Sequence, residues 1–198
     1  MKKVERNELL GLAEYEQIRQ PFFTRMITEK RDRRVLVDDE VSAIFENHDT
    51  VLLQIQEMLR TERISKESAI LHELETYNEL VPGEGELSAT MFIEIPDRIV
   101  RDRRLTELVG LEGHIALEVL GTPVPAKGDS RGVLPDRTTA VHYLKFKLGT
   151  ELSARLVARA MSDPNGAVFF VLSHPKLQVR KELAPATVKS LAEDLVSA

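Results

Sequence analysis

The stretch Phe45–Ile95, FENHDTVLLQIQEMLRTERISKESAILHELETYNELVPGEGELSATMFIEI, carries the clearest pattern in the chain. Its first signal is Asn47-His48-Asp49-Thr50, because Asn and Asp side chains accept hydrogen bonds from the free amides of a first helical turn. The apolar residues that follow fall on one face of an α-helix: Val51, Leu52, Ile55, Met58 and Leu59. This pattern predicts a helix that begins near residue 48.

A second helix and a strand follow within the same stretch. Ser65 is a candidate N-cap for that helix, and the next apolar stripe consists of Ile70, Leu71, Leu74 and Tyr77. Pro82-Gly83-Glu84-Gly85 interrupts the helical pattern. From Glu86 to Ile95 apolar and polar residues alternate, as in a half-buried strand. The stretch therefore predicts helix, helix, strand, with a helical hairpin at about residues 48–80.

The rest of the chain alternates between short helices and short strands. We expect a helical segment over residues 1–33, stopped or restarted at Pro21, and a hairpin of strands 34–37 and 41–46 around Asp38-Asp39. Further expected elements are a helix at 98–109, strands at 114–120, 138–148, 167–172 and 176–183, and helices at 151–160 and 185–196. Residues 121–137, rich in proline and glycine, are expected to form a long loop.

These elements predict an α+β fold in a single domain spanning residues 1–198. Several of the strands are separated by turns too short for a crossover helix, which favours a mixed or largely antiparallel sheet packed by helices.

Composition excludes several classes of function. The chain of 198 residues is 42% hydrophobic and 30% charged, as in a soluble globular protein, and its net charge of −5 disfavours nucleic-acid binding. There is no cysteine, which excludes an iron–sulfur cluster on its own thiolates and a thiol nucleophile. No apolar run approaches the length of a membrane span, and the N-terminus lacks the apolar core of a signal peptide. We therefore expect a cytoplasmic protein.

A metal site is one candidate for chemistry. Divalent iron, manganese or zinc bound without thiolates would use histidine and carboxylate ligands. Glu46, His48 and Asp49 stand together at the start of the first predicted helix and form the best candidate set. The alternative is a helix-capping network with ordinary surface charge.

Other polar residues are candidates for binding: Asn47, Gln54, Glu57, Asp136, Arg137 and His142. Asp136 and Arg137 follow the long loop, and we expect them to anchor residues 121–135 as a lid over a pocket. His142 lies on the apolar face of its predicted strand, where a buried histidine satisfied by a neighbour is the usual structure.

Four segments carry a resemblance to a known family: ELLGLAEYEQIR, FENHDTVLLQIQEMLR, ELETYNELVPGEGELSATMFIEIPD and DRTTAVHYLKF. Together they resemble the bacterial family labelled domain of unknown function 3501 over nearly the whole chain. Genes of that family often stand beside genes for rubrerythrin and iron–sulfur oxidoreductases. The resemblance implies a role near redox or oxidative-stress metabolism and transfers no catalytic residue.

Three functions follow from these observations. The first is an accessory protein that binds a redox or stress protein partner, as the resemblance implies. The second is a metal-dependent enzyme or metal-binding protein that uses histidine and carboxylates, although no catalytic motif is found. The third is a small-ligand binding module with residues 121–135 as its cover. A homodimer is compatible with each of them.

Overall fold

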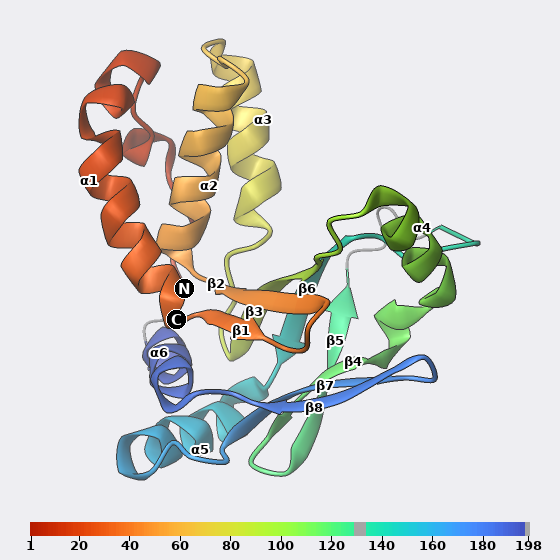
Figure 1. Cartoon of the computed structure of the whole chain (residues 1–198). Coiled ribbons are helices and arrows are strands. Elements are labelled where there is room, and N and C mark those ends of the chain that lie inside the picture. Colours follow the sequence, from red (N-terminus) through yellow and green to blue (C-terminus); the bar gives the residue numbers. More distant parts are fainter. Residues whose placement is uncertain (129–133, 197–198) are drawn as a thin grey trace.

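The computed structural model describes residues 1–128 and 134–196. Within them, eight strands form one curled antiparallel sheet in the order β1-β2-β3-β6-β5-β4-β7-β8 (Figure 1). The strands are β1 (Arg34–Leu36), β2 (Val41–Glu46), β3 (Glu86–Ile93), β4 (Ile115–Val119), β5 (Thr122–Gly128), β6 (Val141–Lys147), β7 (Val168–His174) and β8 (Leu177–Glu182). The predicted α+β fold with an antiparallel sheet is confirmed.

Six α-helices surround the sheet in the described part of the chain. They are α1 (Leu12–Arg31), α2 (His48–Thr61), α3 (Glu67–Asn78), α4 (Arg98–Glu107), α5 (Gly149–Ser162) and α6 (Pro185–Val196). Helices α1, α2 and α3 stand together at one side of the sheet, whereas α5 and α6 lie together on the other (Figure 1). Across the described residues, no helix is both long enough and apolar enough to cross a bilayer.

The helical hairpin predicted from the central stretch is confirmed as α2 and α3. Asn47 caps α2: its side chain accepts a hydrogen bond from the Thr50 amide at 2.9 Å, and the Thr50 hydroxyl accepts one from the Asn47 amide at 2.9 Å. The predicted cap of α3 is wrong by one residue, because Lys66 rather than Ser65 is the N-cap. The two helices bury a small core of their own with the N-terminal segment, made of Val4, Leu9, Val51, Ile55, Leu59, Ile70, Leu74, Leu80 and Val81.

The larger core lies inside the curl of the sheet, beneath α5 and α6. Phe146 of β6 and Phe170 of β7 meet edge to face there, with ring centroids 6.2 Å apart. Leu156 of α5 and Leu191 of α6 belong to the same buried cluster. The face of the sheet toward α5 and α6 is therefore mainly apolar, whereas Glu46, Ser88 and Lys145 lie on the other face, toward α2 and α3.

The predicted break at Pro21 is wrong, since α1 runs without interruption through it. Proline removes one backbone hydrogen bond from a helix, but Pro21 is on the exposed side. Tyr15 and Met26, on either side of it, are completely buried. We infer that packing of both halves of α1 outweighs the lost hydrogen bond.

The predicted loop at 121–137 is wrong for its first half, which is β5. Leu120 and Gly121 both have positive φ, 51° and 78°, as the two central residues of a tight hairpin turn require, so β5 pairs directly with β4. Pro123 and Pro125 concealed the strand. They lie where β5 pairs with β4, whereas its pairing with β6 starts only at Ala126, so neither proline interrupts a second ladder. Residues 129–133 of the predicted loop and lid lie outside the described residues.

Candidate functional site

A row of polar residues crosses four neighbouring strands on the face of the sheet opposite the larger core. Glu46 of β2 pairs with Ser88 of β3, Ser88 with Lys145 of β6, and Lys145 with Lys127 of β5. Residues paired across a sheet point to the same face. The register therefore gathers a carboxylate, a hydroxyl and two ammonium groups that are far apart in sequence.

A cavity of about 560 Å³ lies between this row and the C-terminal end of α3. That volume is within the range of small-molecule sites in proteins. The side chains that line it include Tyr77, Glu86, Ser88, Lys127, Tyr143 and Lys145. Helix α3 thus supplies one wall, and strands β3, β5 and β6 supply the other.

Lys145 is the most constrained charge in this cavity. Its Nζ donates a hydrogen bond to the backbone carbonyl of Val81 at 2.8 Å and lies 3.0 Å from Oε1 of Glu86. The Glu86 carboxylate also accepts a hydrogen bond from the Gly83 amide at 3.1 Å. Burial lowers the pKa of Lys145 below its ordinary value, while the Glu86 carboxylate acts in the opposite direction. The segment that follows α3 and strand β6 are therefore held together at the edge of the cavity.

Ser88 is the unsatisfied group of the site. Ser88 is only 2% exposed, and no described residue supplies a hydrogen-bond partner to its Oγ. Its neighbour in the row, Glu46, is engaged elsewhere, because the hydroxyls of Thr50 and Thr90 donate to the two Glu46 carboxylate oxygens at 2.6 Å each. A buried hydroxyl without a partner is costly and uncommon, so Ser88 marks a position where a bound group would be stabilised.

Two tyrosines give the cavity its aromatic surface. Tyr77 projects from α3, and its pKa is raised mainly by burial, with a smaller contribution from Tyr143. A hydrogen bond joins Tyr77 to the side chain of Gln54 on α2. Tyr77 also lines a second hollow of about 340 Å³, together with Gln54 and Glu57. The predicted binding residue Gln54 thus supports one wall of the main cavity from behind.

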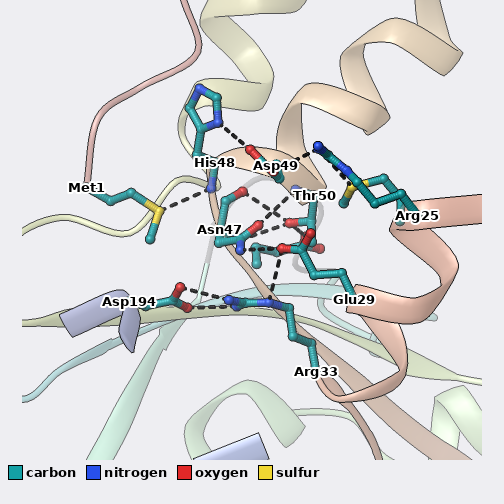
Figure 2. Close-up of polar contacts among 11 residues, drawn as sticks. Met1, Arg25, Glu29, Arg33, Asn47, His48, Asp49, Thr50 and Asp194 are labelled. Atoms are coloured by element: carbon teal, nitrogen blue, oxygen red, sulfur yellow. Dashed lines mark hydrogen bonds and ion pairs between the residues drawn. The ribbon is translucent and has the colours of Figure 1, made fainter. Parts of the chain in front are cut away.

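Of the three predicted metal residues, His48 and Asp49 contact each other, as Figure 2 shows, whereas Glu46 has other partners. His48 Nδ1 lies 2.8 Å from Asp49 Oδ1, and its Nε2 lies 3.1 Å from Glu8. Asp49 also forms an ion pair with Arg25 at 3.0 Å. Glu46 is bound by the two threonine hydroxyls of the polar row. The structure brings His48 and Asp49 together but gives Glu46 different partners, which corresponds to the capping network weighed as the alternative.

In residues 1–128 and 134–196, no group of three or more histidine, cysteine, aspartate or glutamate side chains is placed to hold a metal ion. Asn47, a predicted binding residue, belongs to the same capping network: its Nδ2 donates to Glu29 at 2.9 Å (Figure 2). These residues fix the start of α2 against α1 and the sheet.

Glu57 and His142 also lie outside the main cavity. Glu57 accepts hydrogen bonds from Arg19 at 2.8 and 2.9 Å and from the Tyr15 hydroxyl at 2.7 Å, which joins α2 to α1. His142 is buried on the core side of β6, as predicted, with its Nε2 3.3 Å from the Thr138 hydroxyl.

The predicted anchor of the lid is weaker than expected. Arg137 Nη1 contacts Asp102 of α4 at 3.5 Å, and both side chains are partly exposed. Asp136 is exposed. Arg137 therefore lies beside α4, and neither Asp136 nor Arg137 lines the cavity.

None of the residues that line the cavity was predicted from the sequence as a site residue; among them are Tyr77, Ser88, Lys127, Tyr143 and Lys145. Part of the signal was present, because alternation in β6 puts Tyr143 and Lys145 on the face opposite His142. Ser88 occupies the corresponding polar position in β3. The order and register of the strands, which bring these positions together, have no local signature in the sequence.

Comparisons with known proteins agree with this fold. The family described as "Protein of unknown function (DUF3501)" matches residues 3–195. A solved structure from Burkholderia pseudomallei K96243, described as a novel protein of unknown function, is 34% identical in sequence. It has a TM-score of 0.88, and the match covers 98% of this chain and 100% of that one. A search of curated proteins found no match.

Proposed function

This chain belongs to the family described as "Protein of unknown function (DUF3501)", and because that description assigns no activity, we propose from the cavity itself that the protein binds a small anionic organic molecule between α3 and the sheet. The observation that carries the proposal is Ser88, a residue that lines a cavity of suitable size and whose buried hydroxyl has no partner among the described residues.

The cavity is lined by two glutamates, Glu79 and Glu86, and by two lysines, Lys127 and Lys145, and the two lysines favour an anion beside them. Lys127 and Lys145 stand directly across from each other on β5 and β6, an arrangement of like charges that is unfavourable unless a negative group lies between or beside them. Glu86 compensates Lys145 at 3.0 Å. A carboxylate or phosphate on the ligand would compensate Lys127 and accept a hydrogen bond from Lys145.

The remaining surface of the cavity suits the organic part of such a ligand. Tyr77 and Tyr143 contribute aromatic surface, and Leu80 and Leu144 add apolar area. A few polar groups among apolar walls are typical of sites that recognise one small molecule. Ser88 would then fix the orientation of the ligand by one hydrogen bond.

The proposal is tested by screening a set of small carboxylic acids and organic phosphates by ligand-observed NMR. Hits are then titrated against Ser88→Ala. We expect this variant to bind the hits roughly three- to tenfold more weakly, the value of about one hydrogen bond. The ligand-free variant is expected to unfold at equal or higher denaturant concentration, because a buried unpaired hydroxyl has been removed.

Lys147→Met is the matched control, since Lys147 lies on the same strand but does not line the cavity. Its affinity for the hits should equal that of the natural chain. The proposal fails if no compound of the set binds, or if Ser88→Ala and Lys147→Met bind equally well. A loss of stability in ligand-free Ser88→Ala would instead assign the hydroxyl a structural role.

The accessory role in redox or oxidative-stress metabolism, acting on a protein partner in the cytoplasm, remains a prediction that rests on the family resemblance. It expects a specific partner to co-purify with the tagged chain. Metal binding by His48 and its neighbours also remains a prediction. Elemental mass spectrometry of protein purified without chelator tests it, and a stoichiometric metal lost in His48→Ala would support it.

A further inference from the structure

The surroundings of the Lys145 amine suit a role beyond reversible binding of a ligand. As an ammonium it has three N–H donors, and among the described residues it has two partners, the Val81 carbonyl at 2.8 Å and the Glu86 carboxylate at 3.0 Å. The Lys145 side chain lines the cavity. One position on the nitrogen is therefore available to a group bound there.

Burial favours loss of a proton from this amine. Burial has the largest effect in lowering the pKa of Lys145, and Lys3 acts in the same direction. Glu86 and Glu79 act in the opposite direction. Lys127 lies directly opposite Lys145 on β5. A lysine that is desolvated and placed near another cation is the usual environment of an amine nucleophile.

We propose that Nζ of Lys145 condenses with the carbonyl group of a small anionic aldehyde or ketone, so that the cavity holds this ligand as a Schiff base. The inference rests on the proposed binding function of the same cavity and names its ligand class. The anionic group of the ligand would lie toward Lys127, with its carbonyl carbon beside Lys145.

Glu86 is placed to move the protons that this condensation requires. Its carboxylate takes one proton from the Lys145 ammonium across the 3.0 Å contact. The neutral amine then forms a bond to the carbonyl carbon, and a proton passes from nitrogen to oxygen to give a carbinolamine. Glu86 returns its proton to the hydroxyl, which leaves as water, and a protonated imine remains beside the carboxylate. The balance is one carbonyl consumed and one water released, with no oxidant or reductant.

The test uses the natural chain and glyoxylate, the smallest carbonyl compound that carries a carboxylate. The protein is incubated with a limiting amount of glyoxylate and sodium cyanoborohydride, which reduces an imine to a stable secondary amine, and modified lysines are located by peptide mass spectrometry. We expect Lys145 to be modified roughly tenfold faster than Lys147, which is exposed two residues further along β6. Equal rates at the two lysines, or faster modification of Lys147, would overturn the inference.

Two further measurements separate this inference from the proposed function. Acetaldehyde, which has no anionic group, should show a smaller preference for Lys145 than glyoxylate does. Lys145→Arg keeps the positive charge but cannot form an imine, so it should resist trapping at this position. If the acids bind and Lys145 of the natural chain is not trapped, the Schiff base is wrong and the binding function stands. If no acid or phosphate binds, the binding function fails, whatever glyoxylate does.

Discussion

Arg33 and Asp194, 161 positions apart in sequence, form a buried ion pair through two hydrogen bonds of 2.7 and 2.8 Å (Figure 2). The residues are only 3% and 6% exposed. The pair fixes α6 to the start of β1, and thereby joins the C-terminal helix to the edge of the sheet. Without Asp194, the buried Arg33 guanidinium would keep its longer 3.7 Å contact with Glu29, and removing one partner of a buried pair is far more costly than losing both.

We therefore expect Asp194→Asn to lower the free energy of unfolding by about 3 kcal/mol, measured by urea denaturation. The double variant Arg33→Met, Asp194→Leu should recover at least half of that loss. The matched control is Glu118→Gln, which breaks the exposed bidentate pair of Glu118 with Arg180 and should lower the free energy of unfolding far less than Asp194→Asn does. Equal costs for the buried and exposed pairs would contradict the prediction.

Glu57 should make the protein sensitive to acid. Hydrogen bonds from Arg19 lower the pKa of Glu57 to about 2, with help from Tyr15 and against the effect of burial. The unfolded chain therefore binds a proton here at higher pH than the folded chain does. The stability from this group is complete above about pH 4.5 and is lost as the pH falls toward about 2.

Glu57→Gln should cost about 2 kcal/mol at neutral pH, because the side chain is 23% exposed and the ion pair is partly screened. Urea denaturation from pH 7 to pH 3 checks this: the difference between the natural chain and the variant should shrink as the pH falls. Glu62→Gln, at the exposed end of α2, should leave the curve unchanged. A constant difference at every pH would mean that the variant acts through packing alone.

The elements that the sequence predicted well are those decided locally. Asn47 and the apolar stripe after it determine α2, and the change of period after Gly85 determines β3. The cavity is different in kind. Ser88, Lys145 and Lys127 meet because β6 lies between β3 and β5, and a period of two tells only which face a side chain takes, not which strand is its neighbour. The sequence therefore predicts which face of the sheet Ser88 and Lys145 occupy, but not that the two residues are neighbours.

The turn between β4 and β5 gives a prediction about the strand that the sequence concealed. Gly121 has φ of 78°, where a side chain is strained, and nothing lies within 4 Å of a Cβ placed there. Gly121→Ala should therefore cost about 1 kcal/mol through the backbone alone. Gly121→Asn should cost less, because Asn tolerates this conformation. Gly113→Ala, also with open space around a Cβ, is the control, and thermal unfolding is the measurement. An equal cost at the two glycines would contradict the assigned turn.

Protonation of His142 should destabilise the folded protein as the pH falls below neutral. Burial lowers the pKa of His142 below its ordinary value of 6.5, although the nearby Glu112 carboxylate acts in the opposite direction. The folded chain holds the imidazole neutral while the unfolded chain takes up a proton, so protonation favours unfolding. Stability should fall as the pH drops below about 6.5 and should stop falling once the pH passes the lower pKa of the folded state.

His142→Gln removes this titration, so its free energy of unfolding should vary less than that of the natural chain between about pH 7 and pH 5. His72→Gln, exposed on α3, should keep the natural pH dependence. If His142→Gln and the natural chain lose stability in parallel over this interval, the imidazole is not held neutral in the core, and the Glu112 carboxylate rather than burial determines its protonation.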